Sequence, residues 1–253
     1  MSNLVETLIT HRREARLLDA FPPPVPQDAA TGYAIQDALI ARLPGRVASW
    51  KVAGVRPEDR ETFGEPRVVA FAPAVVHADG TEVVRLAGIK GTAHAVEAEF
   101  AVRLAHDLAE DADADAILAA IGEVRCAVEV CGSVVPGLSA LGPAAAIADH
   151  GNCLFIVLGP RLERWPGIAA ADMVTRISIN GGAAVTGGVD RLEGGMVGAL
   201  SFLNANLRSR GHVLKAGDWV STGATSGSHP ISPGDTARIE WANDHSLDVT
   251  ISV

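Results

Sequence analysis

Two glutamates, Glu97 and Glu99, lie two positions apart in a segment of alternating apolar and polar residues, 96–104. Successive side chains of a β-strand point to opposite faces, so this alternation predicts a strand that carries both carboxylates on one face. A second alternating segment, residues 123–130, places Glu129 on its polar face. Buried carboxylates repel one another, and a hard divalent cation such as Mg²⁺, Mn²⁺ or Ca²⁺ would compensate them. Glu129 is therefore a candidate third ligand.

The same spacing also fits an ordinary strand whose glutamates face water, because antiparallel sheets are often packed on one face only. From the residues alone, this solvated-face interpretation is the more common outcome. Lys51 raises a similar choice, since it lies in a short apolar segment beside Trp50 and Val52. A lysine there can be a desolvated base or an electrostatic anchor, although such side chains more often extend to solvent.

Four further polar residues lie at the ends of expected strands. Asp149 and His150 precede an apolar segment, residues 153–158, that predicts a buried strand. Ser221 and Thr222 end a short strand, where their hydroxyls could hold a carboxylate. Polar residues in such places line sites, but they also form ordinary turns. No nucleophile elbow, paired-histidine zinc motif or phosphate-binding loop accompanies them.

The elements that must position these residues are helices first and mainly strands afterwards. Helical spacing of apolar residues predicts the helices, and the period changes to two from about residue 95. An Asn180-Gly181 turn predicts a hairpin, and residues 56–65 read as a polar loop that could form a mobile flap. The expected helices cover about residues 4–18, 28–42, 111–121 and 195–210; the expected strands cover about 46–52, 95–104, 123–130, 153–158, 173–179, 183–186, 218–222, 236–241 and 247–253, the last two joined through Asn243 and Asp244.

This order favours an α+β fold over a regular βαβ series. We divide the chain into an N-terminal helical region, residues 1–45, and a β-rich catalytic region, residues 46–253, within a single structural unit. The three cysteines, Cys126, Cys131 and Cys153, are expected to be unpaired thiols, because their number and spacing do not form a disulfide framework.

Composition limits the partners of the protein. The 253 residues include 21 Lys and Arg against 30 Asp and Glu, for a formal net charge of −9, and aromatic residues make up 4%. An acidic chain with few aromatic side chains is unsuited to nucleic acid. No apolar run is long enough to span a membrane, and no signal peptide is recognisable. We therefore expect a cytoplasmic protein that binds neither nucleic acid nor membrane.

Several short motifs occur in one order along the chain, from about residue 30 to its end. They are Gly32-Tyr33-Ala34-Ile35-Gln36, Trp50-Lys51-Val52, Val96-Glu97-Ala98-Glu99-Phe100, Val128-Glu129-Val130, Ala148-Asp149 and Gly217-Asp218-Trp219-Val220-Ser221-Thr222-Gly223. In the order of these motifs the sequence resembles the 2-keto-4-pentenoate hydratase group of the fumarylacetoacetate hydrolase superfamily, which also includes 2-oxo-acid decarboxylases.

The resemblance implies a mixed β-roll with N-terminal helices, assembled as a homo-oligomer, and a site that holds Mg²⁺ or Mn²⁺. It implies that Lys51 takes part in proton transfer close to the substrate. The chain departs from the pattern at Thr62, which stands where these hydratases carry an aspartate. Glu61, Glu65 or His150 could supply the missing proton-transfer group. The resemblance implies that Glu97, Glu99 and Glu129 are the metal ligands and that Lys51 is catalytic. Beyond the resemblance, we expect Asp149 to be a second catalytic residue that orients Lys51 or lies at the rim of the pocket. We expect His150, Ser221 and Thr222 to bind the substrate.

The function that follows from the resemblance is a divalent-metal-dependent lyase for a small unsaturated 2-oxo acid. The first hypothesis is a hydratase (a hydro-lyase) of the 2-hydroxypenta-2,4-dienoate type that acts in aromatic catabolism. A 2-oxo-acid decarboxylase, a tautomerase and a C–C bond hydrolase are the alternatives within enzymes, because all three use the same polarised carbonyl. A relative that binds a small molecule without catalysis is the alternative outside enzymes.

Overall fold

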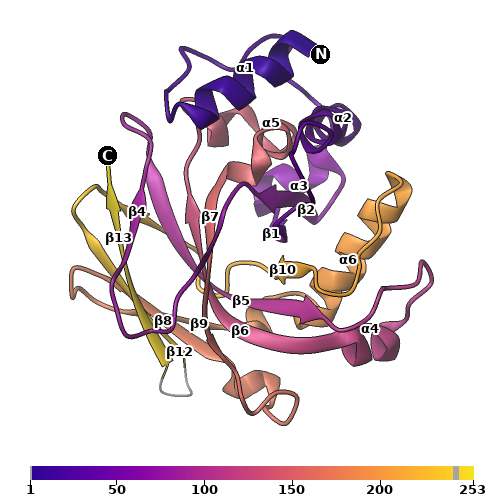
Figure 1. The fold of residues 1–253 in the computed structure, drawn as a ribbon, viewed down its shortest axis with the longest axis vertical. Helices are drawn as coiled ribbons and strands as arrows, with labels where there is room; N and C mark the ends of the chain where they lie inside the picture. The colour runs from indigo at the N-terminus through magenta and orange to yellow at the C-terminus, as the bar shows by residue number, and fades with distance from the viewer. Residues whose placement is uncertain (1, 242–244) are drawn as a thin grey trace.

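A computed structural model describes residues 2–241 and 245–253. Its strands form two sheets, one of eight strands and one of five (Figure 1). The larger sheet contains β1 (Ser49–Gly54), β2 (Arg67–Ala72), β3 (Val75–His77), β5 (His94–Leu104), β6 (Ile121–Cys131), β7 (Cys153–Arg161), β10 (Trp219–Ser221) and β11 (Ser228–Ile231). The smaller sheet contains β4 (Val84–Ala87), β8 (Val174–Ile179), β9 (Val185–Gly188), β12 (Thr236–Trp241) and β13 (His245–Ser252).

Both sheets mix parallel and antiparallel pairs. The larger one has the order β2-β1-β10-β5-β6-β7-β3, and β11 pairs with the end of β5; the smaller one has the order β4-β13-β12-β8-β9. Within the larger sheet, β1 lies parallel to β10, whereas β5, β6 and β7 are antiparallel neighbours. The expected α+β architecture with mixed sheets is confirmed.

Helices cover one end of the larger sheet and its flank (Figure 1). A cluster of α1, α2 and α5 packs at one end, and α6 lies along the flank beside β10. No helix among residues 2–241 and 245–253 has the length and apolar character needed to cross a bilayer. The helices are α1 (Ser2–Arg13), α2 (Ala29–Ile40), α3 (Pro57–Phe63), α4 (Ala114–Ala120), α5 (Pro143–Ala148) and α6 (Gly195–Ser209), with short 3₁₀ turns at η1 (Leu138–Leu141), η2 (His150–Asn152), η3 (Ala170–Asp172) and η4 (Val189–Arg191).

The helix α2 is fixed at its start and along its length. Asp28 caps it by accepting a hydrogen bond of 2.8 Å from the Thr31 amide, which satisfies one free N–H of the first turn. Gly32 lies so close to α5 that an added Cβ would be 2.6 Å from the Ala144 carbonyl oxygen. Glycine at this position therefore allows the two helices to touch.

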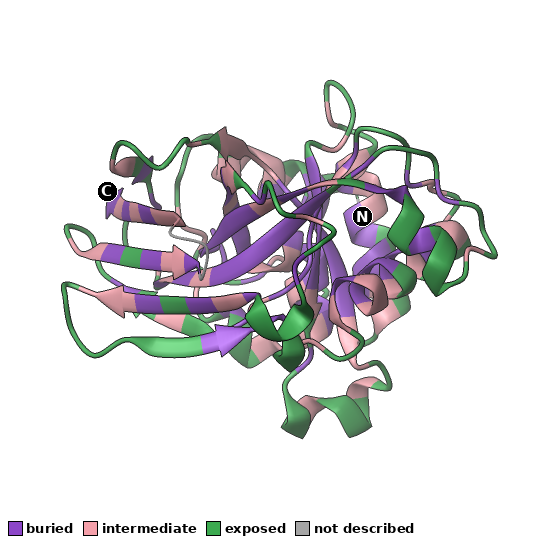
Figure 2. Cartoon of the chain, turned by 90° about the horizontal axis from the view of Figure 1, so that it is seen from below, coloured by how far each residue is buried: buried purple, intermediate pink, exposed green. Residues whose placement is uncertain are grey.

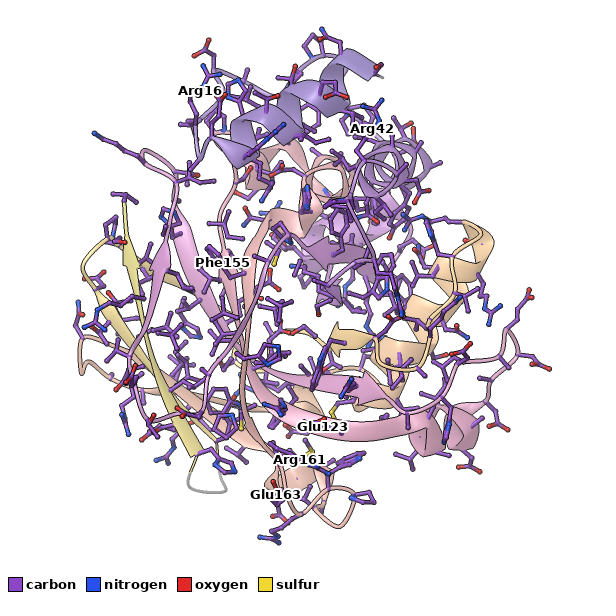
Figure 3. The ribbon with its side chains drawn as sticks, viewed as in Figure 1. Arg16, Arg42, Glu123, Phe155, Arg161 and Glu163 are labelled. Carbon is purple, nitrogen blue, oxygen red and sulfur yellow. The ribbon has the colours of Figure 1, made fainter. Side chains whose placement is uncertain are left out.

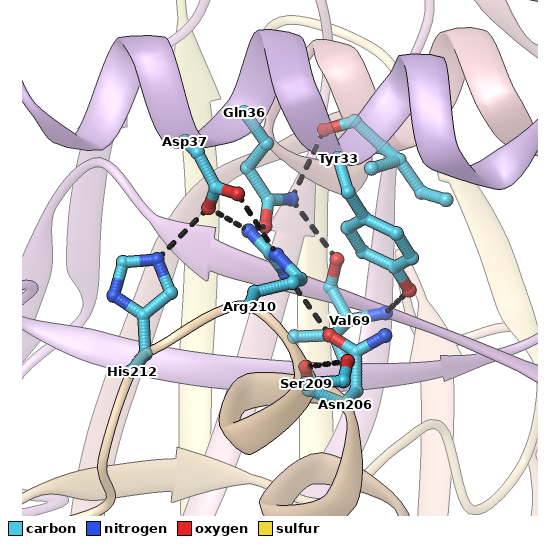
Figure 4. A network of polar contacts seen from close by, with 9 residues as sticks. Tyr33, Gln36, Asp37, Val69, Asn206, Ser209, Arg210 and His212 are labelled. Carbon is cyan, nitrogen blue, oxygen red and sulfur yellow. Dashed lines mark hydrogen bonds and ion pairs between the residues drawn. The ribbon is translucent and has the colours of Figure 1, made fainter.

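A polar network joins α2 to the end of α6 (Figure 4). Arg210 donates to the Gln36 side chain at 2.8 Å and to the Asp37 carboxylate, and its guanidinium lies over the Tyr33 ring. The Gln36 amide in turn donates to the carbonyl oxygens of Val69 and Ile147, at 3.0 and 3.1 Å. The motif around Tyr33 and Gln36 thus connects α2 with β2, α5 and α6.

Residues 56–65 correct one sequence prediction, because most of them form the helix α3 and not a loop. Pro57 occupies the first turn, where its missing N–H has no cost, and acidic residues follow it in that turn. Gly64 ends the helix in the left-handed conformation, at φ 83°. The helix has no buried residue, so it lacks the apolar periodicity from which a helix is predicted.

Other strand and turn predictions are confirmed with shifted ends. The predicted hairpin is formed by β8 and β9, with positive φ at both Asn180 and Gly181. The strand expected to start near residue 46 begins at Ser49. The predicted connection through Asn243 and Asp244 lies outside the described residues.

Most residues of β5 and β6 are buried, and buried residues run along the long central strands in Figure 2, so both faces of this part of the larger sheet are covered. One face carries large side chains such as Phe100 and Val128 and belongs to the main hydrophobic core. The other face carries a small cluster of Ala72, Ala101, Ala127, Cys153, Ile156 and Leu158. Register places Glu97, Glu99, Glu129 and Lys51 on this second face, beside small side chains that leave room for polar groups.

Candidate metal centre and active site

Lys51 and Glu129 form a buried ion pair at the centre of the second face. Glu129 is directly opposite Glu97 across β5 and β6. The Lys51 ammonium donates to Glu129 Oε1 and, at 3.0 Å, to the Gly151 carbonyl oxygen. The two paired side chains are only 2% and 1% exposed. The solvated-face interpretation is therefore wrong for Glu129, and Lys51 does not extend to solvent.

The burial of this pair contrasts with the ion pairs elsewhere on the molecule. Figure 3 labels Arg16, Arg42 and Glu163, whose side chains lie at the periphery. Each takes part in an ion pair that is about half exposed or more. Such surface pairs contribute little to stability, whereas a buried pair must offset the loss of hydration of both charges. The Lys51–Glu129 pair therefore calls for a specific explanation.

Glu99 lies on the same face and is held by two donors. The Ser221 hydroxyl donates to Glu99 Oε2, and the Gly223 amide donates to the same oxygen at 3.2 Å. Ser221 is brought there because β10 lies between β1 and β5, with Ser221 beside both Lys51 and Ala101. Glu99 is 1% exposed, and Glu97, nearer the end of the strand, is only partly buried.

The electrostatics of the site are unbalanced. Burial raises the pKa of Glu99, and the charges of Glu129 and Glu97 raise it further. Burial also raises the pKa of Glu129, against the opposing effect of Lys51. Burial by itself would lower the pKa of Lys51, but the negative groups around it, Glu129 foremost, bring the pKa above its ordinary value. Lys51 is therefore an ammonium ion, and it compensates one of three carboxylates.

A set of potential metal donors surrounds Glu129. One oxygen each from Glu97 and Glu129 and the sulfur of Cys131 all lie within 4.8 Å of one another. Glu129 Oε2 is buried and has no hydrogen-bond partner among the described residues. A buried carboxylate oxygen without a partner is costly, and a divalent cation would satisfy it. These donors fit a cation, although Glu99 lies outside the set of mutual contacts and Cys131 lies within it.

The turn before β7 supplies the carbonyl that holds Lys51. His150, Gly151 and Asn152 follow one another with φ of 57°, 66° and 64°, a left-handed stretch that costs energy at the two residues other than glycine. Gly151 has a second reason to be glycine, because an added Cβ would be 2.9 Å from the Cε atom of Lys51. Such strain persists only where surrounding contacts fix the backbone.

Asp149 and Arg12 provide these contacts. Arg12 of α1 donates to Asp149 Oδ1 at 2.8 Å and to the Cys153 carbonyl oxygen at 3.0 Å. The Ser133 hydroxyl donates to the other carboxylate oxygen at 2.5 Å. Asp149 is fully buried, and both of its oxygens are engaged. The structure thus places this predicted catalytic residue in the support of the turn; the described contacts do not join it to the three glutamates.

The predicted substrate-binding residues differ in their surroundings. Ser221 is at the site, bound to Glu99. The Thr222 hydroxyl donates a hydrogen bond to the Phe100 carbonyl oxygen at 2.9 Å, so it stabilises the backbone of β5. His150 packs its ring against Phe71. Burial, together with the nearby Arg12 charge, lowers the pKa of His150, so its ring is neutral.

The region around α3 lies beside this site. A cavity of about 170 Å³ is bounded by the end of β1, by α3 and by α5, and Gly151 and Asn152 form part of its wall. None of the three glutamates lines it. Glu61, Thr62 and Glu65 are exposed to solvent, so the structure does not bring the residue at the departure from the family pattern into the carboxylate cluster.

Three contributors were missed by sequence reasoning. Cys131 follows Glu129 by two positions, so strand alternation alone puts it on the same face, but the sequence analysis predicts it only as an unpaired thiol. Arg12 lies within the first expected helix, where no local pattern marks it as a partner of Asp149. Ser133 lies beyond the end of β6, and no local pattern distinguishes it. The last two act through contacts across more than ten positions, which a sequence pattern does not contain.

Comparison with known proteins bears on the fold. No protein-family model matches the sequence. The structure of 4-oxalocrotonate decarboxylase from Pseudomonas putida G7, complexed with magnesium and adipate, matches with a TM-score of 0.78 at 18% identity, over 98% of this chain and 96% of that one. Fumarylpyruvate hydrolase from Pseudomonas aeruginosa, in complex with Mn²⁺ and pyruvate, matches with a TM-score of 0.64 at 16% identity, over 81% of this chain and 89% of that one.

A third match is 5-carboxymethyl-2-hydroxymuconate delta-isomerase from Mycobacterium smegmatis, with a TM-score of 0.55 at 20% identity, over 81% of this chain and 79% of that one. At these identities the likeness concerns the fold. The protein has the fumarylacetoacetate-hydrolase-like fold that its sequence predicts.

Proposed function

We propose that the protein is a divalent-metal-dependent enzyme that acts on a small 2-oxo acid. The observation that carries this proposal is a cluster of three carboxyl groups with a single ammonium beside them. Glu97, Glu99 and Glu129 together face one compensating ammonium, Lys51, and Glu129 Oε2 has no hydrogen-bond partner among the described residues. A divalent cation would supply the further positive charge that favours the ionised form of these carboxyl groups. The neighbouring folds support the proposal, since two of those structures contain magnesium or Mn²⁺ together with a small acid.

Each residue of the site has its own role in this proposal. Glu97, Glu99 and Glu129 would hold the cation, Mg²⁺ or Mn²⁺, with Ser221 and the Gly223 amide orienting Glu99. When bound, such an ion is a Lewis acid that polarises the carbonyl of a chelating 2-oxo acid and stabilises negative charge on its oxygen. Lys51 donates the proton that the electron-rich substrate carbon must receive, and the Gly151 carbonyl fixes the position of its ammonium.

Within this class the geometry supports decarboxylation best. Breaking the bond to CO₂ leaves an electron pair on the substrate, and a single proton donor completes the reaction, a role that Lys51 fills. Hydration needs, in addition, a group that activates water; Thr62 stands where the resemblance places an aspartate, and Glu61 and Glu65 are exposed. Hydration of 2-hydroxypenta-2,4-dienoate is the second candidate, favoured by the order of the sequence motifs. Homo-oligomeric assembly and a place in aromatic catabolism stay predictions.

A substrate panel tests the proposal. Metal-free protein is supplied with Mg²⁺ or Mn²⁺ and with 4-oxalocrotonate, 2-hydroxypenta-2,4-dienoate or fumarylpyruvate, and the products are identified by ultraviolet absorbance and mass. We expect loss of CO₂ from 4-oxalocrotonate that stops on addition of a chelator. Water addition without CO₂ release would favour the hydratase. A protein that binds the cation yet turns over no 2-oxo acid would support the non-catalytic alternative.

A further inference from the structure

Cys131 occupies a distinct position on the site face of β6. It follows Glu129 by two residues, and its partner across the sheet, Ala95, precedes Glu97 by two. Its sulfur lies 3.6 Å from Glu129 Oε1 and belongs to the set of three donors within 4.8 Å. The two other cysteines lie outside that set: Cys126 packs in the main hydrophobic core, and Cys153 faces Cys131 from β7.

These separations suit ligands of one ion. Oxygen ligands lie about 2.0–2.6 Å from Mg²⁺ or Ca²⁺, and a thiolate lies about 2.3 Å from Zn²⁺. Two ligands of one ion are therefore separated by at most about 5 Å. The three donors, from Glu97, Glu129 and Cys131, satisfy this limit without movement of the backbone.

A second observation points independently to a ligand at the same place. Glu129 is 1% exposed, and its Oε1 already accepts from Lys51. Its Oε2 is buried without a hydrogen-bond partner among the described residues. Ordinary packing of a thiol beside this carboxylate would leave that oxygen unsatisfied, whereas an ion shared with Cys131 would satisfy it.

From these contacts we infer that Cys131 is an additional ligand of the cation, and that its sulfur gives the site affinity for thiophilic divalent ions such as Zn²⁺, Co²⁺ and Fe²⁺. This inference rests on the proposed function, because it concerns the same cation site. Thiolate is a soft ligand that favours these ions over Mg²⁺. As the metal–sulfur bond forms, the thiol loses its proton to the buffer, so the charge of the ligand set becomes more negative by one.

Cobalt provides a direct readout of the bond. Metal-free protein is titrated with Co²⁺, and sulfur-to-cobalt charge-transfer absorption is recorded in the near ultraviolet. Calorimetry measures the affinity for Zn²⁺ and Mg²⁺ in parallel. We expect the band in the native protein and its loss in Cys131→Ser. The same substitution should weaken Zn²⁺ binding by at least the roughly 10- to 100-fold effect of losing an outer-shell partner, and Mg²⁺ binding much less.

Cys153→Ser is the matched control, since Cys153 is an equally buried thiol on the same face. It should retain the band, and Glu129→Gln should abolish it. A band that survives in Cys131→Ser, or native protein that binds cations without a band, would overturn the inference while leaving the metal-dependent function in place. Native protein that binds none of the cations would instead overturn the proposed function. If Cys131→Ser does not fold, the same measurement is made on Cys131→Ala, which should also lack the sulfur-to-cobalt band that the native protein shows.

Discussion

The two sheets of this protein carry charge in opposite ways. On the five-stranded sheet, Arg238 pairs with Glu240 along β12 and with Asp248 across to β13, and all three side chains are a third to a half exposed. On the eight-stranded sheet, Lys51 and Glu129 are almost completely buried. Both sheets show the alternation of a packed strand, so the pattern of residues does not distinguish them.

The difference shows what burial adds to a charge pattern. Water and salt screen the exposed pairs, and each contributes about 1 kcal/mol or less to stability. The carboxyl groups of Glu99 and Glu129, in contrast, lose their hydration, and burial raises the pKa of both. Stability alone does not explain so many buried carboxyl groups, because an apolar core of the same volume is often at least as stable. The proposed binding of a cation would explain them.

Of the substitutions that compare the two sheets, the one at Lys51 should have the largest effect, and that effect should be on turnover. Lys51→Met removes the proposed proton donor and should lower kcat by about 10²- to 10⁴-fold, the usual contribution of a general acid. Cation binding, measured by calorimetry, should persist because the carboxylates remain. Arg238→Met on the other sheet is the control and should keep normal kcat. Near-normal kcat in Lys51→Met would show that the assigned role is wrong.

Loss of the buried ion pair between Arg12 and Asp149 should lower the stability of the protein. Arg12→Gln leaves the Asp149 carboxylate buried with the Ser133 hydroxyl as its remaining side-chain donor. Removal of one partner of a buried pair costs about 3–5 kcal/mol. We expect a decrease of that size in the free energy of unfolding, measured by urea denaturation. A decrease of less than about 1 kcal/mol would mean that the pair behaves like one at the surface.

A smaller effect should separate two glycines that share a left-handed backbone. Gly151 and Gly181 have φ of 66° and 68°, but a Cβ at Gly151 would meet Ala70 at 2.7 Å, whereas Gly181 has open space. Substitution by alanine costs about 1–2 kcal/mol at either position for the backbone. Gly151→Ala should cost about 1–3 kcal/mol more because of overpacking beside Lys51. Equal decreases in unfolding free energy would contradict the tight packing of that turn.

The smallest effect is expected on the five-stranded sheet itself. Arg238→Gln removes a cation that is 48% exposed, and the carboxylates it leaves remain accessible to water. The free energy of unfolding should change by about 0.5 kcal/mol or less. Chemical denaturation at low and high salt checks this expectation. A loss comparable with that of Arg12→Gln would remove the distinction between the two sheets.

The sequence predicted those parts of the fold that depend on near neighbours. Alternation located β5 and β6 and put Glu97 and Glu99 on one face, and the Asn180-Gly181 pair located the β8–β9 hairpin. The helix α3 was missed because its stability comes from its ends, at Pro57 and Gly64, and not from an apolar face.

The features of the site that the sequence did not predict depend on contacts between residues far apart along the chain. Sequence reasoning selected Glu129 by its polar face, and the burial that distinguishes it from a surface glutamate arises from elements far away along the chain. The hydrogen bond from the Lys51 ammonium to the Gly151 carbonyl oxygen joins residues 100 positions apart, and the ion pair between Arg12 and Asp149 joins residues 137 positions apart. Neither leaves a periodic signal. Asp149 was predicted to be catalytic, and this stays a prediction; its contacts with Arg12 and Ser133 became visible only in the structure.

The place of β10 in the larger sheet has a consequence for the order in which the protein assembles. This strand lies between β1 and β5, so β1 cannot join the sheet before residues 219–221 have been synthesised. Until then Lys51 is separated from Glu129, and the carboxylates stay hydrated on an incomplete sheet. The burial of charge is thereby deferred to a late, long-range step, of the kind that slows folding. Isolated chains truncated before Trp219 should accordingly leave β1 open to proteolysis, whereas the full chain should protect it.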